Sequence, residues 1–183
     1  MALSKIQSES INLADTFAFT GTVTGTPSIT EFDLFRLTTD FSGNQTAITN
    51  VERQDTGTFE KIGTGVTESS GVFSFASTGK YLVTGVANFV IGNSAEENDQ
   101  EFYLDTTVDN GSNYVRETYA RIGMDESKNP RNAQAIVQTC VDVTDTSQVK
   151  VKFAVGSSSS NVSSLSSTNA NYTYFTFMRI GDT

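Results

Sequence analysis

Apolar side chains recur at every second residue through most of the chain from Phe32 onward. This period belongs to β-strands, whose successive side chains point to opposite faces. The clearest rows on one strand face are Tyr81, Val83, Gly85, Ala87 and Phe89; Phe102, Leu104, Thr106 and Val108; Val137, Thr139, Val141 and Val143; and Val149, Val151, Phe153 and Val155. In the last row Lys150 and Lys152 take the opposite face, which separates a buried side from a solvent side. No segment has a helical period of 3.6 residues with end caps, so the sequence predicts an all-β fold.

Turn residues separate these strands at short intervals. The hairpin signal Asp109-Asn110-Gly111-Ser112 is the strongest, and Ser69-Ser70-Gly71 is a further break. Many short strands joined by such turns are typical of an antiparallel sandwich or barrel. A length of 183 residues fits one domain. Because residues 1–30 are weakly patterned, we expect an N-terminal arm over 1–30 and one β-domain over 31–183.

Charge and rare residue types exclude several classes of function. The formal net charge is −9, whereas nucleic acids and anionic membranes attract cationic surfaces, so we expect neither as a partner. Histidine is absent, which removes Ser–His and Cys–His nucleophile pairs and His-ligated metal sites. The single cysteine, Cys140, forms no disulfide within the chain, and we expect a buried, inert thiol there.

The first residues give no sign of export or membrane insertion. The opening from Met1 to Ser10 has no apolar core of the ~7–15 residues that a secretory signal needs. No apolar run approaches the ~20 residues of a membrane span. We therefore expect a chain made and folded in a cytoplasm, without a signal peptide.

The stretch from Gly71 to Val83 carries the most specific pattern, Gly-Val-Phe-Ser-Phe-Ala-Ser-Thr-Gly-Lys-Tyr-Leu-Val. It resembles the G-x-F-x-x-P-x-x-G-x-Y-x-F stretch of C1q/TNF-like jelly rolls. We expect Phe73, Phe75, Tyr81 and Val83 to supply the buried side of two strands, with Gly79 at the turn between them. The late hairpin around Val141 to Val151 and the closing strand, expected from Tyr172 to Ile180, follow in the order of that family.

The resemblance covers about residues 32–180 and implies an antiparallel jelly-roll sandwich that forms a homotrimer. For the trimer interface we predict the aromatic residues of the closing strand, which are Tyr172, Tyr174, Phe175 and Phe177. This chain departs from the family pattern at Ala76, where the family has Pro, and at Asp145-Thr146, where it has Gly-Asp. These departures leave the fold inference in place but carry over no receptor or calcium site.

A jelly roll of this kind without an export signal resembles bacteriophage virion proteins, which leave the cell by lysis. The function predicted from this resemblance is a non-enzymatic structural protein of the virion surface, a trimeric capsid decoration protein or outer knob. The alternative is the receptor- or glycan-binding tip of a tail or head fibre. A small carbohydrate-active enzyme is the third hypothesis.

Acidic residues supply the candidate chemistry. Asp105, Glu117 and Asp142 lie on predicted strands, where a facing carboxylate pair would serve glycoside hydrolysis, but solvent-facing strand charges explain them better, because no pocket can be inferred from the sequence. The segment from Asn93 to Glu101, expected to be an acidic loop, offers oxygen ligands for calcium without EF-hand spacing. Residues 156–168 are expected to be a second, Ser-rich loop. We predict no catalytic residue and no cofactor, and the resemblance leaves calcium on a trimer axis as an alternative.

The N-terminal arm is too apolar for a free linker. Its apolar residues, which we predict to form an attachment surface, are Ile6, Ile11, Leu13, Phe17 and Phe19. Segments of this composition order when they bind a partner. The partner predicted here is either a neighbouring subunit or the virion surface, and backbone pairing as an added strand would contribute to that binding.

Overall fold

Every regular element in the described part of the chain is a β-strand. The computed structural model describes residues 29–91, 97–124 and 131–183. The strands are β1 (Phe32–Leu37), β2 (Val51–Arg53), β3 (Thr67–Ser69), β4 (Val72–Ser74), β5 (Gly79–Ile91), β6 (Glu97–Thr107), β7 (Val115–Met124), β8 (Arg131–Val143), β9 (Lys150–Gly156), β10 (Val162–Ser164) and β11 (Tyr174–Gly181). No helix long and apolar enough to cross a membrane occurs among these residues.

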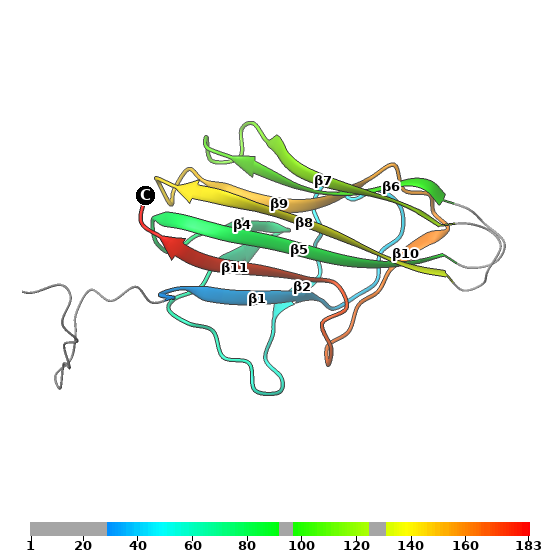
Figure 1. Cartoon of the computed structure of the whole chain (residues 1–183), viewed down its shortest axis with the longest axis horizontal. Coiled ribbons are helices and arrows are strands. Elements are labelled where there is room, and N and C mark those ends of the chain that lie inside the picture. The colour runs from blue at the N-terminus through cyan, green and yellow to red at the C-terminus, as the bar shows by residue number, and fades with distance from the viewer. Residues whose placement is uncertain (1–28, 92–96, 125–130) are drawn as a thin grey trace, which may run out of the picture.

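The strands form two antiparallel sheets packed as a sandwich (Figure 1). Sheet A has the order β10-β5-β11-β1-β2, and β8 pairs with the free edge of β5 over thirteen residues. Sheet B has the order β3-β4-β9-β6-β7. Neighbouring strands are often far apart in sequence, as in the pairs β1–β11 and β4–β9. This crossing connectivity, with two antiparallel sheets, is the predicted jelly roll.

The core lies between the sheets and is built from the apolar rows of the alternating strands. Phe73, Phe75, Tyr81 and Val83 are all buried there, which confirms the register predicted from Gly71 to Val83. Aromatic rings join the two sheets at the centre. The rings of Phe153 on β9 and Phe175 on β11 stack with centroids 4.1 Å apart.

Local turn chemistry agrees with the sequence at the predicted hairpin and at one of the further predicted breaks. Ser70 and Gly71 have positive φ between β3 and β4, and Asn110 and Gly111 have positive φ between β6 and β7. Asn and Gly tolerate this backbone region at little steric cost. Val108 was expected to continue the buried row of β6, but that strand ends at Thr107 and Val108 is exposed.

Two segments expected to be loops are partly strands. Residues 97–101 of the acidic segment continue β6, because Glu101 lies opposite Arg121 on β7 and forms an ion pair with it. In the Ser-rich segment, Val162–Ser164 forms β10 against the end of β5. Polar strand segments of this kind carry too little apolar alternation to be told from loops by sequence. Residues 93–96 lie outside the described residues.

Gly85 on β5 lies directly against aromatic rings of sheet B. A methyl group at this position would lie 2.5 Å from Phe153 and 2.8 Å from Phe102, inside the contact distance of carbon atoms. We expect Gly85→Ala to lower the free energy of unfolding by about 1–3 kcal/mol through overpacking, measured by urea denaturation. The matched control is Gly181→Ala, where a methyl group meets no atom within 4 Å, and an equal loss in both variants would contradict this explanation.

Candidate functional site

The outer side of sheet A carries a patch of apolar and uncharged polar residues, here called the A face, which lies next to the charged row of Lys80 and Asp142. Residues directly opposite each other on paired strands point to the same side of a sheet. Three cross-strand rows over β1, β11, β5 and β8 make up this face: Phe32, Met178, Leu82 and Cys140; Leu34, Thr176, Thr84 and Gln138; and Arg36, Tyr174, Val86 and Ile136. Arg36 is the one charged residue in the rows, and it is only 1% exposed. Its guanidinium forms ion pairs with Glu52 at 2.8 Å and Asp55 at 2.7 Å, so the A face presents no free charge.

The outer side of sheet B, here called the B face, has the opposite character. Its rows over β9, β6 and β7 are Lys152, Asp105 and Arg116; Ala154, Tyr103 and Tyr119; and Gly156, Glu101 and Arg121. Charges of both signs pair across it, with Arg121 2.8 Å from Glu101. The Arg116 guanidinium lies 3.4 Å from the centre of the Tyr103 ring. The charges of this face are therefore paired with one another within the chain.

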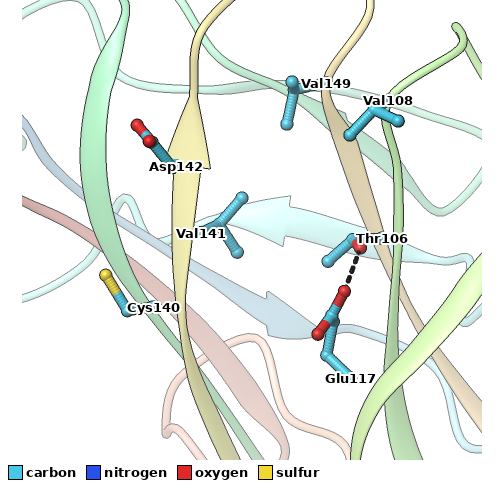
Figure 2. Close-up of a pocket in the computed structure, with 7 residues that line it drawn as sticks. All are labelled: Thr106, Val108, Glu117, Cys140, Val141, Asp142 and Val149. Atoms are coloured by element: carbon cyan, nitrogen blue, oxygen red, sulfur yellow. Dashed lines mark hydrogen bonds between the residues drawn. The ribbon is translucent and has the colours of Figure 1, made fainter. Parts of the chain in front are cut away.

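A groove opens where the edge strands β7 and β8 of the two sheets meet. It consists of adjoining hollows of 140 Å³ and 250 Å³ that share Thr106, Val108 and Glu117. We call it the seam groove. The Thr106 hydroxyl donates to the Glu117 carboxylate at 2.8 Å. Val141 points from β8 toward this pair, whereas Cys140 and Asp142 project from the other side of the same strand and form the rim (Figure 2).

The structure does not gather the three candidate catalytic carboxylates into one pocket. Glu117 and Asp142 line the first hollow, whereas Asp105 is not among its lining residues. Asp105 lies on the B face, 3.6 Å from Arg116 and 4.0 Å from Lys152. Burial raises the pKa of Asp105, and those two cations partly oppose the shift. A hollow of 140 Å³ is also smaller than the ~300 Å³ at which small-molecule pockets begin.

No metal centre is apparent among the described residues, where His, Cys, Asp and Glu form no group of three or more suited to an ion. The described part of the acidic segment directs Glu101 to Arg121 and Arg116, so its carboxylate serves ion pairs of the B face. Calcium on an assembly axis is untested by a single chain.

Asp109 organises the hairpin beside the seam groove. Its carboxylate accepts hydrogen bonds from the Thr107 hydroxyl at 2.6 Å and from the Asn113 backbone and side chain at 2.9 and 2.7 Å. These donors, led by Thr107, lower the pKa of Asp109 to about 2. The side chain therefore stays ionised at every pH at which the fold is expected to function.

We expect carbon NMR to show Asp109 titrating with a pKa of about 2, below the unfolded value of ~3.9. A folded pKa below the unfolded one adds stability above pH ~4 and loses it as the pH falls through about 2. Thr107→Val, which removes the first donor, should raise the pKa of Asp109. An Asp109 pKa near 4 in the native protein would contradict the hydrogen-bonded geometry.

The predicted interface residues divide between the core and the surface. Phe175 is 0% and Phe177 is 1% exposed, so these two belong to the core and their assignment to an interface was wrong. The alternation of β11 explains the error, because odd positions face inward and Tyr174 faces outward beside Val86. Tyr172 is half exposed just before the strand. Whether Tyr172 and Tyr174 contact another subunit is untested.

Two other predictions concerned Cys140 and the N-terminal arm. Cys140 is exposed, contrary to the prediction of a buried thiol, because the period that buries Val137 and Val141 turns Cys140 outward with Gln138. The predicted arm residues Ile6, Ile11, Leu13, Phe17 and Phe19 lie outside the described residues. The A face was missed, although its signal was present in the sequence as apolar or uncharged residues at the outward positions of alternating strands.

Comparisons with known proteins support the fold. No family model matches the sequence, and no curated protein matches it. Among solved structures, the chain is similar to murine APRIL, crystallised at pH 5.0, with a TM-score of 0.57 and 8% identity over 81% of this chain and 98% of that one. It is similar to Eiger TNF from S. frugiperda with a TM-score of 0.56 and 10% identity over 86% of this chain and 95% of that one. At such identities the likeness shows the fold alone, which is a TNF-like jelly roll.

Proposed function

We propose that this chain is a non-enzymatic structural protein that assembles as a homotrimer through the A face. The single observation that carries the proposal is the contrast between the two outer faces of the sandwich. On a chain of net charge −9, three rows of the A face present no free charge, whereas the B face is crossed by paired charges. Charged residues are depleted at the centres of protein interfaces.

The exposed apolar groups of the A face add a driving force for assembly. Ile136 is 55% exposed at the edge strand, and Leu82, Met178 and Tyr174 are partly exposed along the rows. Burial of apolar surface stabilises a complex by ~25 cal/mol per Å², and obligate interfaces commonly bury more than ~2,000 Å². The trimeric state follows from the resemblance of the sequence to C1q/TNF-like heads.

Light scattering on the purified chain tests the assembly. We expect a mass close to three times the 19.8 kDa of one chain, unchanged on dilution to micromolar concentration, because obligate interfaces of this size do not dissociate there. Salt should leave the mass unchanged, since the rows of the A face offer no free charge that could form an ion pair with another subunit. A stable monomer at micromolar concentration would overturn the proposal.

The finer proposal is a role on the surface of a bacteriophage particle, as a capsid decoration protein or outer knob. Its support is the sequence resemblance, together with an acidic chain that offers no histidine for catalysis and a B face suited to solvent. Quantitative mass spectrometry of purified particles tests it. Many copies per particle support decoration of a shell, a few copies support the tip of a fibre, and absence from particles would overturn the virion role.

A further inference from the structure

The seam groove combines aliphatic walls with an open mouth. The valines that line its two hollows are Val108, Val115, Val141 and Val149. Val108 is 74% and Val115 is 62% exposed, so two of the four stand largely in solvent. The neighbouring edges of β7 and β8 are also free, since no described strand pairs with the outer edge of either. Free strand edges beside an apolar groove are suited to an extended segment that adds as a strand.

The charges of the groove define what it accepts. Glu117, Asp142 and Asp109 line it, and none of its lining residues is Lys or Arg. Lys80 lies opposite Asp142 across β5 and β8, but its ammonium donates to the backbone carbonyl of Asp182 at 2.9 Å. An occupant that complements this groove carries an aliphatic side chain next to a cation.

The sequence outside the described residues offers such a pair at one place. Lys5 is the only Lys or Arg among residues 1–28, and Ile6 follows it directly. The point at which this segment joins the fold is also close to the groove. Phe32, Met178, Leu82 and Cys140 form one cross-strand row, so the start of β1 lies three strand spacings from the rim of the groove, about 15 Å.

Chain length does not limit the contact. The residues between Ile6 and Phe32 would span up to ~80 Å when extended, several times the separation. We propose that the seam groove binds the N-terminal segment of this chain, with Ile6 between the aliphatic walls and Lys5, on the other side of the extended segment, facing the carboxylate of Asp142 on the rim. The groove shares Cys140 with the A face at the edge strand β8, so the docking and the assembly are tested by separate measurements.

Disulfide trapping tests the docking site. In a Cys140→Ser background, which removes the native thiol, Val108→Cys at the shared wall of the two hollows is combined with Ile6→Cys. The comparison variant combines Val108→Cys with Thr22→Cys. A disulfide needs its Cα atoms within ~7 Å, so the oxidation rate in glutathione buffer, followed by non-reducing electrophoresis, reports how often each arm position visits the groove.

The two variants discriminate docking from random encounter. A flexible chain of ~10 residues has a mean span of ~17 Å and one of ~26 residues ~28 Å, so an undocked arm would trap Thr22→Cys at least as fast as Ile6→Cys. We expect the reverse order, with Ile6→Cys at least tenfold faster. A rate for Thr22→Cys that equals or exceeds the rate for Ile6→Cys would overturn the proposal.

A separate variant tests the proposed ion pair of Lys5. Adding Lys5→Gln to the Ile6→Cys variant should slow trapping by up to about fivefold, the range that loss of one exposed ion pair gives. An unchanged rate would overturn the pairing of Lys5 with the carboxylate of Asp142. A crosslink within one chain or between two chains supports the proposal equally, and the electrophoretic mass shows whether the segment binds its own subunit or a neighbour. Loss of the trimer in light scattering, with trapping intact, would overturn the assembly and not the docking.

Discussion

Truncation of Phe73 to alanine is expected to lower the free energy of unfolding by about 3–5 kcal/mol. Phe73 lies on β4 of sheet B and is fully buried. Its ring reaches across the sandwich to sheet A, with centroid distances of 4.9 Å to Phe177 and 5.3 Å to Phe35. Removing it leaves a cavity at the point where the two sheets share their aromatic contacts, and neighbouring rings held by both sheets cannot collapse fully into it.

Urea denaturation of the purified protein measures this loss, at a protein concentration held constant because assembly adds to stability. Val108→Ala is the control, since Val108 is 74% exposed and surface truncations usually change stability by less than ~0.5 kcal/mol. A loss below about 1 kcal/mol for Phe73→Ala would mean that the strand register is wrong, because a slip of one residue moves a whole row to the other face.

The core could be predicted from the sequence because burial in this fold follows the period of two. Tyr81 and Val83 on β5, and Val151 and Phe153 on β9, recur at every second position and are buried as expected. Each row is a local signal within one strand. Local patterns of this kind need no knowledge of which strands pair, so a single sequence suffices to find them.

The interface was harder to predict because counting aromatic residues ignores which side of the strand they take. Phe175 and Phe177 were assigned to an interface because one strand carries more aromatic residues than its own core face was expected to use. In the structure both rings pack in the core against Phe73 and Phe153 of the other sheet. The sequence feature that indicates the proposed interface is the set of outward-facing residues on β5, β8 and β11. Those residues form one surface only after non-local pairing places Val86 between Tyr174 and Ile136.

Other features depend wholly on tertiary context. The seam groove is lined by residues of β6, β7 and β8 and of the turns beside them, between Thr106 and Val149 in the sequence. No sequence motif predicts it. Gln100 is fully buried, although its side-chain amide has no hydrogen-bond partner among the described residues. Polar residues are normally paired when buried, so the sequence indicated a solvated loop at this position instead of an inward-facing strand residue.

Ile136→Asp is expected to abolish the trimer. Ile136 stands 55% exposed on β8, in the row that joins it to Val86 and Tyr174. A carboxylate placed in an interface without free charge becomes an unpaired buried charge, which typically costs several kcal/mol at each site. A symmetric trimer would contain three such charges, and the cost in the assembly multiplies accordingly.

Tyr119→Asp on β7 is the matched control, because Tyr119 is 57% exposed but lies on the B face, among charges that pair with one another. Light scattering should give a monomer mass for Ile136→Asp and an unchanged trimer for Tyr119→Asp, while circular dichroism shows both variants folded. Since the two substitutions introduce the same charge at the same exposure, only their position on the sandwich differs. Dissociation by Tyr119→Asp alone would move the interface to sheet B, and a trimer that survives both substitutions would exclude the A face as the assembly surface.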